Sequence, residues 1–208
     1  MKIPTLQKAN DLLDKAKELN PGLWIDHSVN VAKAARIIAE HCSELDPETA
    51  YILGLLHDIG RRVGVSQMRH IIDGYNYLIS MGYNDAARIC MTHTFSYKNI
   101  NAIFGEWDCE IDELKFIENY IYNIEYCDYD LLIQLSDSLA IPSGFCLIEK
   151  RMIDTALKFG PNEYSVKKWK GVLDIKQYFE KKTNCSIYTL MPGIVKNTFG
   201  VNLKDIEL

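Results

Sequence analysis

The 208-residue chain lacks several features that would assign it to a specialised class. Its six cysteines include no CxxC pair, which argues against a zinc finger. The N-terminal segment has no apolar leader core, and no later stretch approaches the roughly 20 apolar residues of a membrane-spanning helix. A formal net charge of -5 leaves no cationic surplus for a broad nucleic-acid-binding face, although a small nucleotide stays compatible. We therefore expect a cytoplasmic protein with reduced thiols and with neither a membrane nor a nucleic-acid polymer as partner.

The composition and periodicity indicate an all-α fold. Hydrophobic residues make up 48% and charged residues 25%, as in ordinary globular domains, and 208 residues suffice for one large core. No convincing period-two strand pattern precedes the tail. We expect residues 1–182 to form a single helical domain. Residues 183–208 should form a less regular C-terminal extension that packs on the body or on a second copy in a homodimer.

The stretch YILGLLHDIGRR, residues 51–62, contains the most informative pattern. Asp46-Pro47-Glu48 is a typical helix N-terminus, and the helix that follows runs through apolar residues into His57 and Asp58. We expect Gly60 to end it. A buried carboxylate needs a partner, because desolvation otherwise favours its neutral form. A cation bound by the His57-Asp58 pair would provide that partner.

Helical periodicity places further chemistry-bearing residues on buried faces. The inward-facing set consists of His27, His57, Asp58, His70, His93 and Asp137. Imidazole nitrogens and carboxylate oxygens suit zinc, iron, manganese or nickel, and the set is too large for one tetrahedral ion. Asp58 could bridge two ions. His41 lies fourteen residues beyond His27, about 21 Å along a helix, so we predict that it is not a ligand.

The order H, HD, H, H, D over residues 23–141 resembles the HD superfamily of metal-dependent phosphohydrolases, and its two-metal members in particular. The strongest pieces are LLHDIGRR and Leu135-Ser136-Asp137. The resemblance implies a first metal held by His27, His57, Asp58 and Asp137, and a second held by His70, His93 and the shared Asp58. Bacterial hydrolases of symmetrical dinucleoside tetraphosphates are the nearest family by this resemblance, since they share the His93-Thr94 pair.

The resemblance implies a hydrolase that cleaves a nucleotide or another small phosphoester with a metal-activated water. Asp58 would orient the nucleophile, and Arg61 would neutralise the charge that develops on phosphorus. Arg61 and Thr94 are the expected substrate-binding residues, although family members usually have lysine at the position of Arg61. The expected cofactors are two divalent ions, with iron first and manganese, zinc or nickel as alternatives.

Two other functions are compatible with the same residues. Some HD-fold proteins resembling this chain are mixed-valent di-iron oxygenases with a similar ligand order. A non-catalytic nucleotide sensor could also retain the fold, although binding alone would not need six ligands. Two further features, Arg62 and a tyrosine cluster, have two possible roles each. Arg62 could bind phosphate or lie on a solvated helix end. The tyrosines at 120, 122, 126 and 129 could pack or stack on a base, and residues 99–110 should form a loop that could border a pocket. The lysines at 167, 168 and 170 are expected on a wet surface.

Overall fold

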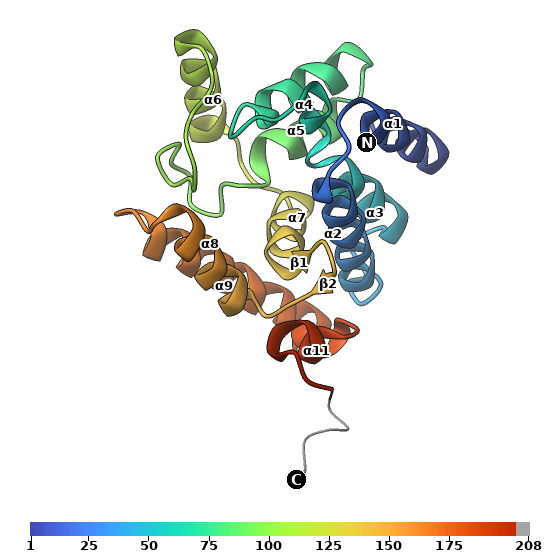
Figure 1. Cartoon of the computed structure of the whole chain (residues 1–208). Helices are drawn as coiled ribbons and strands as arrows, with labels where there is room; N and C mark the ends of the chain where they lie inside the picture. The colour runs from blue at the N-terminus through green and yellow to red at the C-terminus, as the bar shows by residue number, and fades with distance from the viewer. Residues whose placement is uncertain (203–208) are drawn as a thin grey trace.

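The structure, a computed structural model, describes residues 1–202 and is all-α, as predicted (Figure 1). Apart from the helices, the described part of the chain contains one hairpin of two short strands, β1 and β2. The elements in chain order are α1 (Leu6–Leu19), α2 (Leu23–Ala39), α3 (Pro47–Leu56), the 3₁₀ helix η1 (Ile59–Val63), α4 (His70–Ser80), α5 (Asn84–Thr92), α6 (Ile111–Asn123), α7 (Asp128–Leu139), β1 (Ala140–Ile141), β2 (Gly144–Phe145), α8 (Ile148–Phe159), α9 (Ser165–Thr183), α10 (Ile187–Leu190) and α11 (Ile194–Phe199).

The start of α3 is built as the sequence predicts. The Asp46 side chain accepts a hydrogen bond from the Thr49 amide at 2.7 Å, and Pro47 occupies the first helical turn, where its missing N–H has no consequence. The apolar residues that follow are almost completely buried, and the helix ends with His57 as its C-cap. His57 and Asp58 therefore leave α3 inside the protein.

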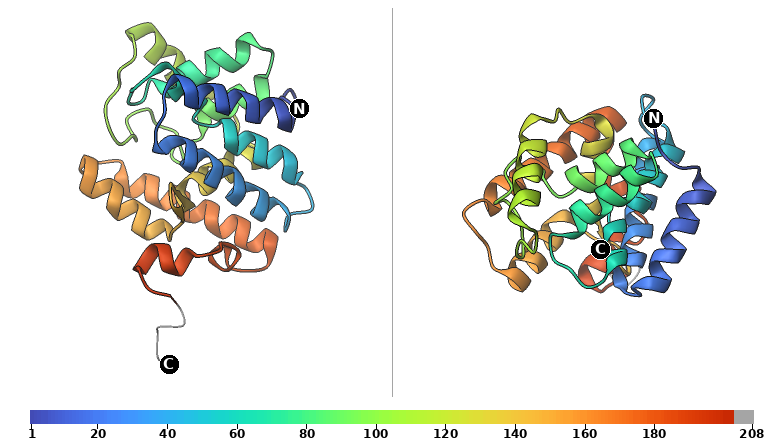
Figure 2. Two further views of the ribbon diagram at one scale, coloured as in Figure 1. Left: turned by 45° about the vertical axis from the view of Figure 1, so that its right-hand side comes forward. Right: turned by 90° about the horizontal axis from the view of Figure 1, so that it is seen from above.

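Two apolar clusters position the helices that surround the site. The larger one joins α1, α2, α3, α5, α7 and α9, and the smaller lies between α4, α5 and α6 and includes Ile71, Phe95 and Ile117. Figures 1 and 2 show α4 and α5 on one side of α7, with α8 and α9 on the other. The chain after α5 and the helix pair α8–α9 thus approach the same central helix from opposite sides.

The prediction that Gly60 ends a helix is wrong. Gly60 lies inside η1, and a Cβ there would lie 1.9 Å from the His70 carbonyl oxygen and 2.5 Å from the Gly74 nitrogen. A glycine is required because η1 and the first turn of α4 touch backbone to backbone. This contact holds His70 close to Asp58.

The segment after α7 departs slightly from the expectation of no strands. The helix ends at Leu139, and the chain then makes the β1–β2 hairpin, with Ala140 opposite Phe145. Farther on, α9 continues through Thr183, across the predicted domain boundary. Ile187, Met191 and Ile194 of the predicted extension belong to the larger apolar cluster, whereas Phe199 is exposed. The rest of that extension, 203–208, lies outside the described residues.

Within residues 1–202, none of the helices combines the length and the apolar character needed to cross a membrane. The six cysteines are free thiols, as expected, with Cys42, Cys90 and Cys146 buried.

Candidate metal centre

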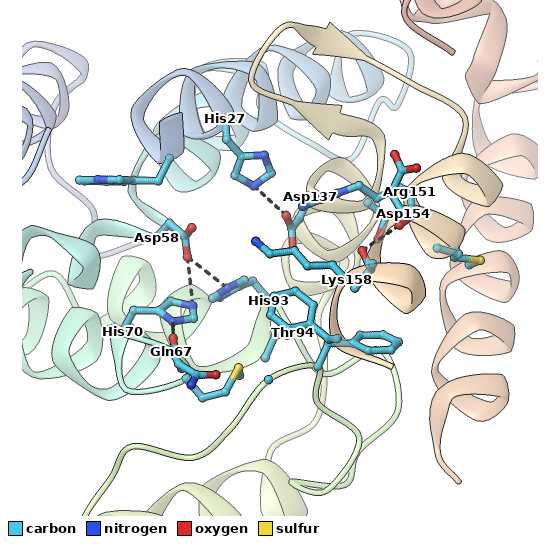
Figure 3. Close-up of a pocket in the computed structure, with 18 of the residues that line it drawn as sticks. His27, Asp58, Gln67, His70, His93, Thr94, Asp137, Arg151, Asp154 and Lys158 are labelled. Atoms are coloured by element: carbon cyan, nitrogen blue, oxygen red, sulfur yellow. Dashed lines mark hydrogen bonds and ion pairs between the residues drawn. The ribbon is translucent and has the colours of Figure 1, made fainter. Parts of the chain in front are cut away.

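The six predicted ligand residues meet at one place in the structure. His27 comes from α2, His57 and Asp58 from the α3–η1 junction, His70 from the start of α4, and His93 from the end of α5. Asp137 comes from α7. Figure 3 shows the labelled side chains of this set converging from separate helices. All are buried except Asp137, which is partly exposed.

The distances between the polar atoms describe a compact cluster. His27 Nε2 lies 2.9 Å from Asp137 Oδ1, and Asp58 Oδ1 lies 3.1 Å from His70 Nε2 and 3.6 Å from His93 Nε2. Three groups have ligand atoms all within 4.8 Å of one another and could each hold a metal ion: His27, His57 and Asp58; His57, His93 and Asp137; Asp58, His70 and His93. Asp58 is common to the first and third groups, as a bridging ligand would be.

Backbone carbonyls fix three of the imidazole rings. His57 Nδ1 donates to the Gly54 oxygen at 2.7 Å, His93 Nδ1 to the Cys90 oxygen at 3.0 Å, and His70 Nδ1 to the Gln67 oxygen. A nitrogen that donates to a carbonyl carries the proton, so in the neutral ring the lone pair belongs to Nε2. Carbonyl partners of this kind orient metal-binding histidines and set their tautomer. In all three residues Nε2 faces the cluster.

Electrostatics in the cluster favour neutral imidazoles at His57 and His93 and ionised carboxylates at Asp58 and Asp137. Burial lowers the pKa of His57 and brings the pKa of His93 to about 3, where the neighbouring His57 acts in the same direction. Burial alone would raise the pKa of Asp58, but Arg61 and His70 hold it well below its usual range. The pKa of Asp137 is lowered in the same way, because the contact with His27 outweighs its burial. These are the protonation states that metal ligands need at neutral pH.

Orphaned polar atoms at the centre of the cluster fit a bound cation. Within residues 1–202, His57 Nε2 and Asp58 Oδ1 are buried without a hydrogen-bond partner, and His27 Nδ1 also lacks one. Buried polar groups without partners cost about 1–3 kcal/mol each. The donor set of nitrogen and carboxylate oxygen suits zinc, iron, manganese or nickel. The residues present therefore fit divalent metal ions.

The cluster forms one wall of a cavity of about 1110 Å³. The predicted loop 99–110 borders it through Phe104, Gly105 and Glu106, as expected. Arg151, Asp154 and Lys158 of α8 lie on another side (Figure 3). Four cationic side chains line the cavity among the described residues: Arg61, Arg151, Lys158 and Lys168. The aromatic lining consists of Trp24, Phe104, Phe159 and Trp169.

The residues predicted to bind substrate also lie in this cavity. Arg61 Nε donates to Asp58 Oδ2 at 2.6 Å, and its Nη2 is 3.4 Å from His70 Nε2, so the guanidinium touches the cluster directly. Thr94 lines the cavity next to His93. Arg62 is different, because its guanidinium lies 4.1 Å from the centre of the Tyr77 ring and outside the cavity lining. The structure places Arg62 away from the candidate phosphate site, and instead of lying on a fully solvated helix end its side chain packs on Tyr77 and is partly buried.

The prediction that Lys168 lies on a wet surface is wrong. Lys168 is partly buried in the cavity wall, whereas Lys167 and Lys170 are exposed. Burial lowers the pKa of Lys168 to about 8, although Asp137 acts in the opposite direction. Its position four residues before the buried Val172, and hence on the same face of α9, was the sequence signal that could have identified it.

The tyrosine cluster and His41 serve other purposes. Tyr126 donates to the Phe95 carbonyl at 2.8 Å, and the Tyr129 hydroxyl accepts from the Asp46 amide at 2.9 Å. None of the four tyrosines is among the described residues that line the cavity; Tyr120 packs against the rings of Tyr75 and Phe116, whereas Tyr122 is exposed. His41 is exposed, with Nδ1 2.9 Å from the Ile37 oxygen, and belongs to none of the three groups found in residues 1–202.

Metal binding should stabilise the protein measurably. Adding Mn²⁺, Zn²⁺, Ni²⁺ or anaerobic Fe²⁺ to chelator-treated protein at about 100 times its Kd is expected to raise Tm by about 5–10 °C, since such binding contributes about 2.7 kcal/mol. Differential scanning calorimetry measures the shift. Ca²⁺ is the control, because it prefers all-oxygen sites and should shift Tm less. Equal Tm values with and without each of the four ions would contradict the assignment.

Comparison with known protein families supports the reading of the cluster. No curated protein and no solved structure matches the chain. The family model for the HD domain matches residues 24–141, more than half of the 208 residues, and this span contains every member of the cluster. HD domains bind divalent metal ions and are generally metal-dependent hydrolases. The chain therefore belongs to the HD domain family.

Proposed function

We propose that the protein is a phosphohydrolase that uses two divalent metal ions to cleave a nucleotide or another small phosphoester. The observation that carries the proposal is the sharing of Asp58 between two groups of candidate ligands, at the wall of a cavity lined by cationic side chains. Paired-metal hydrolytic sites need a shared ligand to hold their ions about 3.5–4 Å apart. The cationic side chains of the cavity can contact an anionic substrate, and Glu106 and Asp154 are the carboxylates of residues 1–202 outside the candidate ligand set that line the same cavity.

The first ion would be held by His27, His57, Asp58 and Asp137, and the second by Asp58, His70 and His93. Iron is the proposed metal, with manganese, zinc and nickel as alternatives, because all four accept nitrogen and carboxylate ligands. When bound, the ions supply Lewis acidity that lowers the pKa of a water molecule to near neutrality. The Gly54, Gln67 and Cys90 carbonyls hold three imidazoles in the tautomer that this binding needs.

Arg61 and Thr94 are the proposed contacts to the reacting phosphoryl group. The Arg61 guanidinium, partly exposed to the cavity and anchored on Asp58, would neutralise charge that develops on the phosphoryl oxygens. Asp58 would orient the attacking water from its place between the two groups of candidate ligands. Thr94 would donate from its hydroxyl at the side of His93.

The proposed substrate class is a nucleotide, and dinucleoside polyphosphates belong among the candidates. A cavity of about 1110 Å³ can hold a molecule of this size. Trp24 and Phe104 offer flat apolar surfaces for a base, while Arg151 and Lys158 provide positive charge away from the candidate metal centre.

Phosphate release by the purified, metal-loaded chain tests the proposal. We expect one or more compounds from a panel of nucleoside monophosphates, polyphosphates, dinucleoside polyphosphates and sugar phosphates to be hydrolysed with kcat near the enzyme range of about 1–10³ s⁻¹. Colorimetric phosphate detection and chromatography of the products give the rate and the bond cleaved. Oxygen consumption is recorded in parallel. Oxygen uptake with an organic substrate, together with no hydrolysis of any compound in the panel, would contradict the proposal.

A further inference from the structure

A helix outside the span matched by the HD domain contributes to the cavity. Lys168 lies in the first turn of α9, beyond residue 141, and its side chain joins the wall that also contains His93, Thr94 and Asp137. A second cavity of about 50 Å³ is lined by Lys168, these three residues and Gln134. Polar space large enough for a small group therefore adjoins the Lys168 side chain.

The backbone of α9 is fixed where Lys168 leaves it. Ser96 Oγ donates to the Lys168 carbonyl oxygen at 3.0 Å. One turn later, a Cβ on Gly171 would lie 2.4 Å from the Ser96 carbonyl oxygen, so only glycine permits this approach. The loop that follows His93 thus holds α9 at close range. The backbone from which the Lys168 side chain enters the cavity wall is therefore fixed before any ligand binds.

The Lys168 ammonium has weak partners in the protein. Its polar contact is with Thr94 Oγ1 at 3.4 Å, and the Phe104 ring centre lies 5.4 Å away. Within residues 1–202 it forms no ion pair, although Lys176 and Lys182 on the same helix do. Asp137 favours the charged form of Lys168 but makes no ion pair with it, and a partly buried charge without such a pair is costly unless a ligand supplies a counter-ion. Gln134 Oε1, in the wall of the small cavity, also lacks a partner among the described residues.

We propose that Lys168 is a phosphate-binding residue, which together with Thr94 holds an anionic oxygen of the substrate beside the candidate metal centre. The inference deepens the proposed function and depends on it for the identity of the substrate. The lowered pKa of the ammonium agrees with a group that an incoming anion would stabilise in its charged form. Lys168 touches the substrate in this account and holds no metal.

Titration calorimetry with inorganic phosphate tests the proposal on the metal-loaded full chain. We compare wild type with Lys168→Met, Lys168→Arg and Lys167→Met, and determine the metal content of each by elemental analysis. Lys167 is the matched control, because it is exposed and its Nζ lies 5.5 and 5.6 Å from the rings of Tyr97 and Tyr164 instead of in the cavity. Circular dichroism establishes that each variant is folded.

The Kd for phosphate should rise at least about tenfold in Lys168→Met, because the loss of one charge-assisted hydrogen bond weakens binding by about this factor. It should rise less in Lys168→Arg and stay unchanged in Lys167→Met, with equal metal content throughout. A Kd within twofold of wild type in Lys168→Met would overturn the proposal, as would metal loss in both Lys168 variants. Lys168-dependent phosphate binding without turnover of any phosphoester would instead leave this site standing and remove the proposed function.

Discussion

Replacing His57 by asparagine is expected to lower the proposed phosphate release by about 10³-fold or more, because a proposed metal ligand is lost and metal ions contribute several kcal/mol to transition-state stabilisation. The asparagine amide can still donate to the Gly54 carbonyl, as His57 Nδ1 does at 2.7 Å. It has no atom at the place of Nε2, which faces the cluster. The variant therefore removes the ligand atom while it preserves the backbone contact.

Two measurements separate this result from simple unfolding. Elemental analysis should give less metal per chain for His57→Asn than for wild type, and circular dichroism should give the same helical content. His41→Asn is the matched control, because His41 is exposed and outside the candidate groups in residues 1–202. It should retain full activity and full metal content. Wild-type metal content and activity in His57→Asn would refute the role given to His57.

Replacing Arg88 by methionine should destabilise the protein by about 3 kcal/mol, because it leaves a buried carboxylate without its counter-charge. Asp130 is fully buried and accepts from Arg88 Nε at 2.9 Å, from Thr92 Oγ1 at 2.7 Å and from the Cys127 amide at 2.8 Å. This network joins the end of α5 to the start of α7. His93 and Asp137 extend from these two helices, so the Arg88–Asp130 ion pair also supports the candidate metal centre.

Urea denaturation measures the effect as a lower midpoint at an unchanged m-value. Arg69→Met is the comparison, since Arg69 makes two hydrogen bonds to Glu113, at 2.7 and 2.8 Å, with both side chains partly exposed. Its loss should cost less than about 1 kcal/mol. Equal losses of stability in the two variants would show that burial of Asp130 does not set the strength of the Arg88 contact.

The helical fold and the convergence of the cluster could be predicted because both depend on periodicity. A stripe of apolar residues tells which face of a helix is buried, and a histidine or aspartate within the stripe must point inward. His27, His93 and Asp137 were identified in this way. The ordered spacing of six such residues over more than a hundred positions then indicated one site instead of six separate core side chains.

The roles of Gly60 and Lys168 could not be predicted from the sequence pattern, because both depend on contacts between segments that are distant in the chain. Gly60 suggested a helix end, but its function is to let η1 touch the backbone of His70 and Gly74. The basic run around Lys168 predicts a solvent-exposed surface. Lys168 is nevertheless partly buried, because α9 packs closely against the loop at Ser96. Such contacts are set by how the helices pack, and periodicity within a single helix does not report them.

A crystal structure of the metal-loaded protein, with anomalous scattering measured at the metal absorption edge, tests the central claim most directly. The account predicts two anomalous peaks about 3.5–4 Å apart, with Asp58 between them and with His57 and His70 on different ions. A single peak bound away from Asp58, or no peak near His27, His57 and His93, would contradict it.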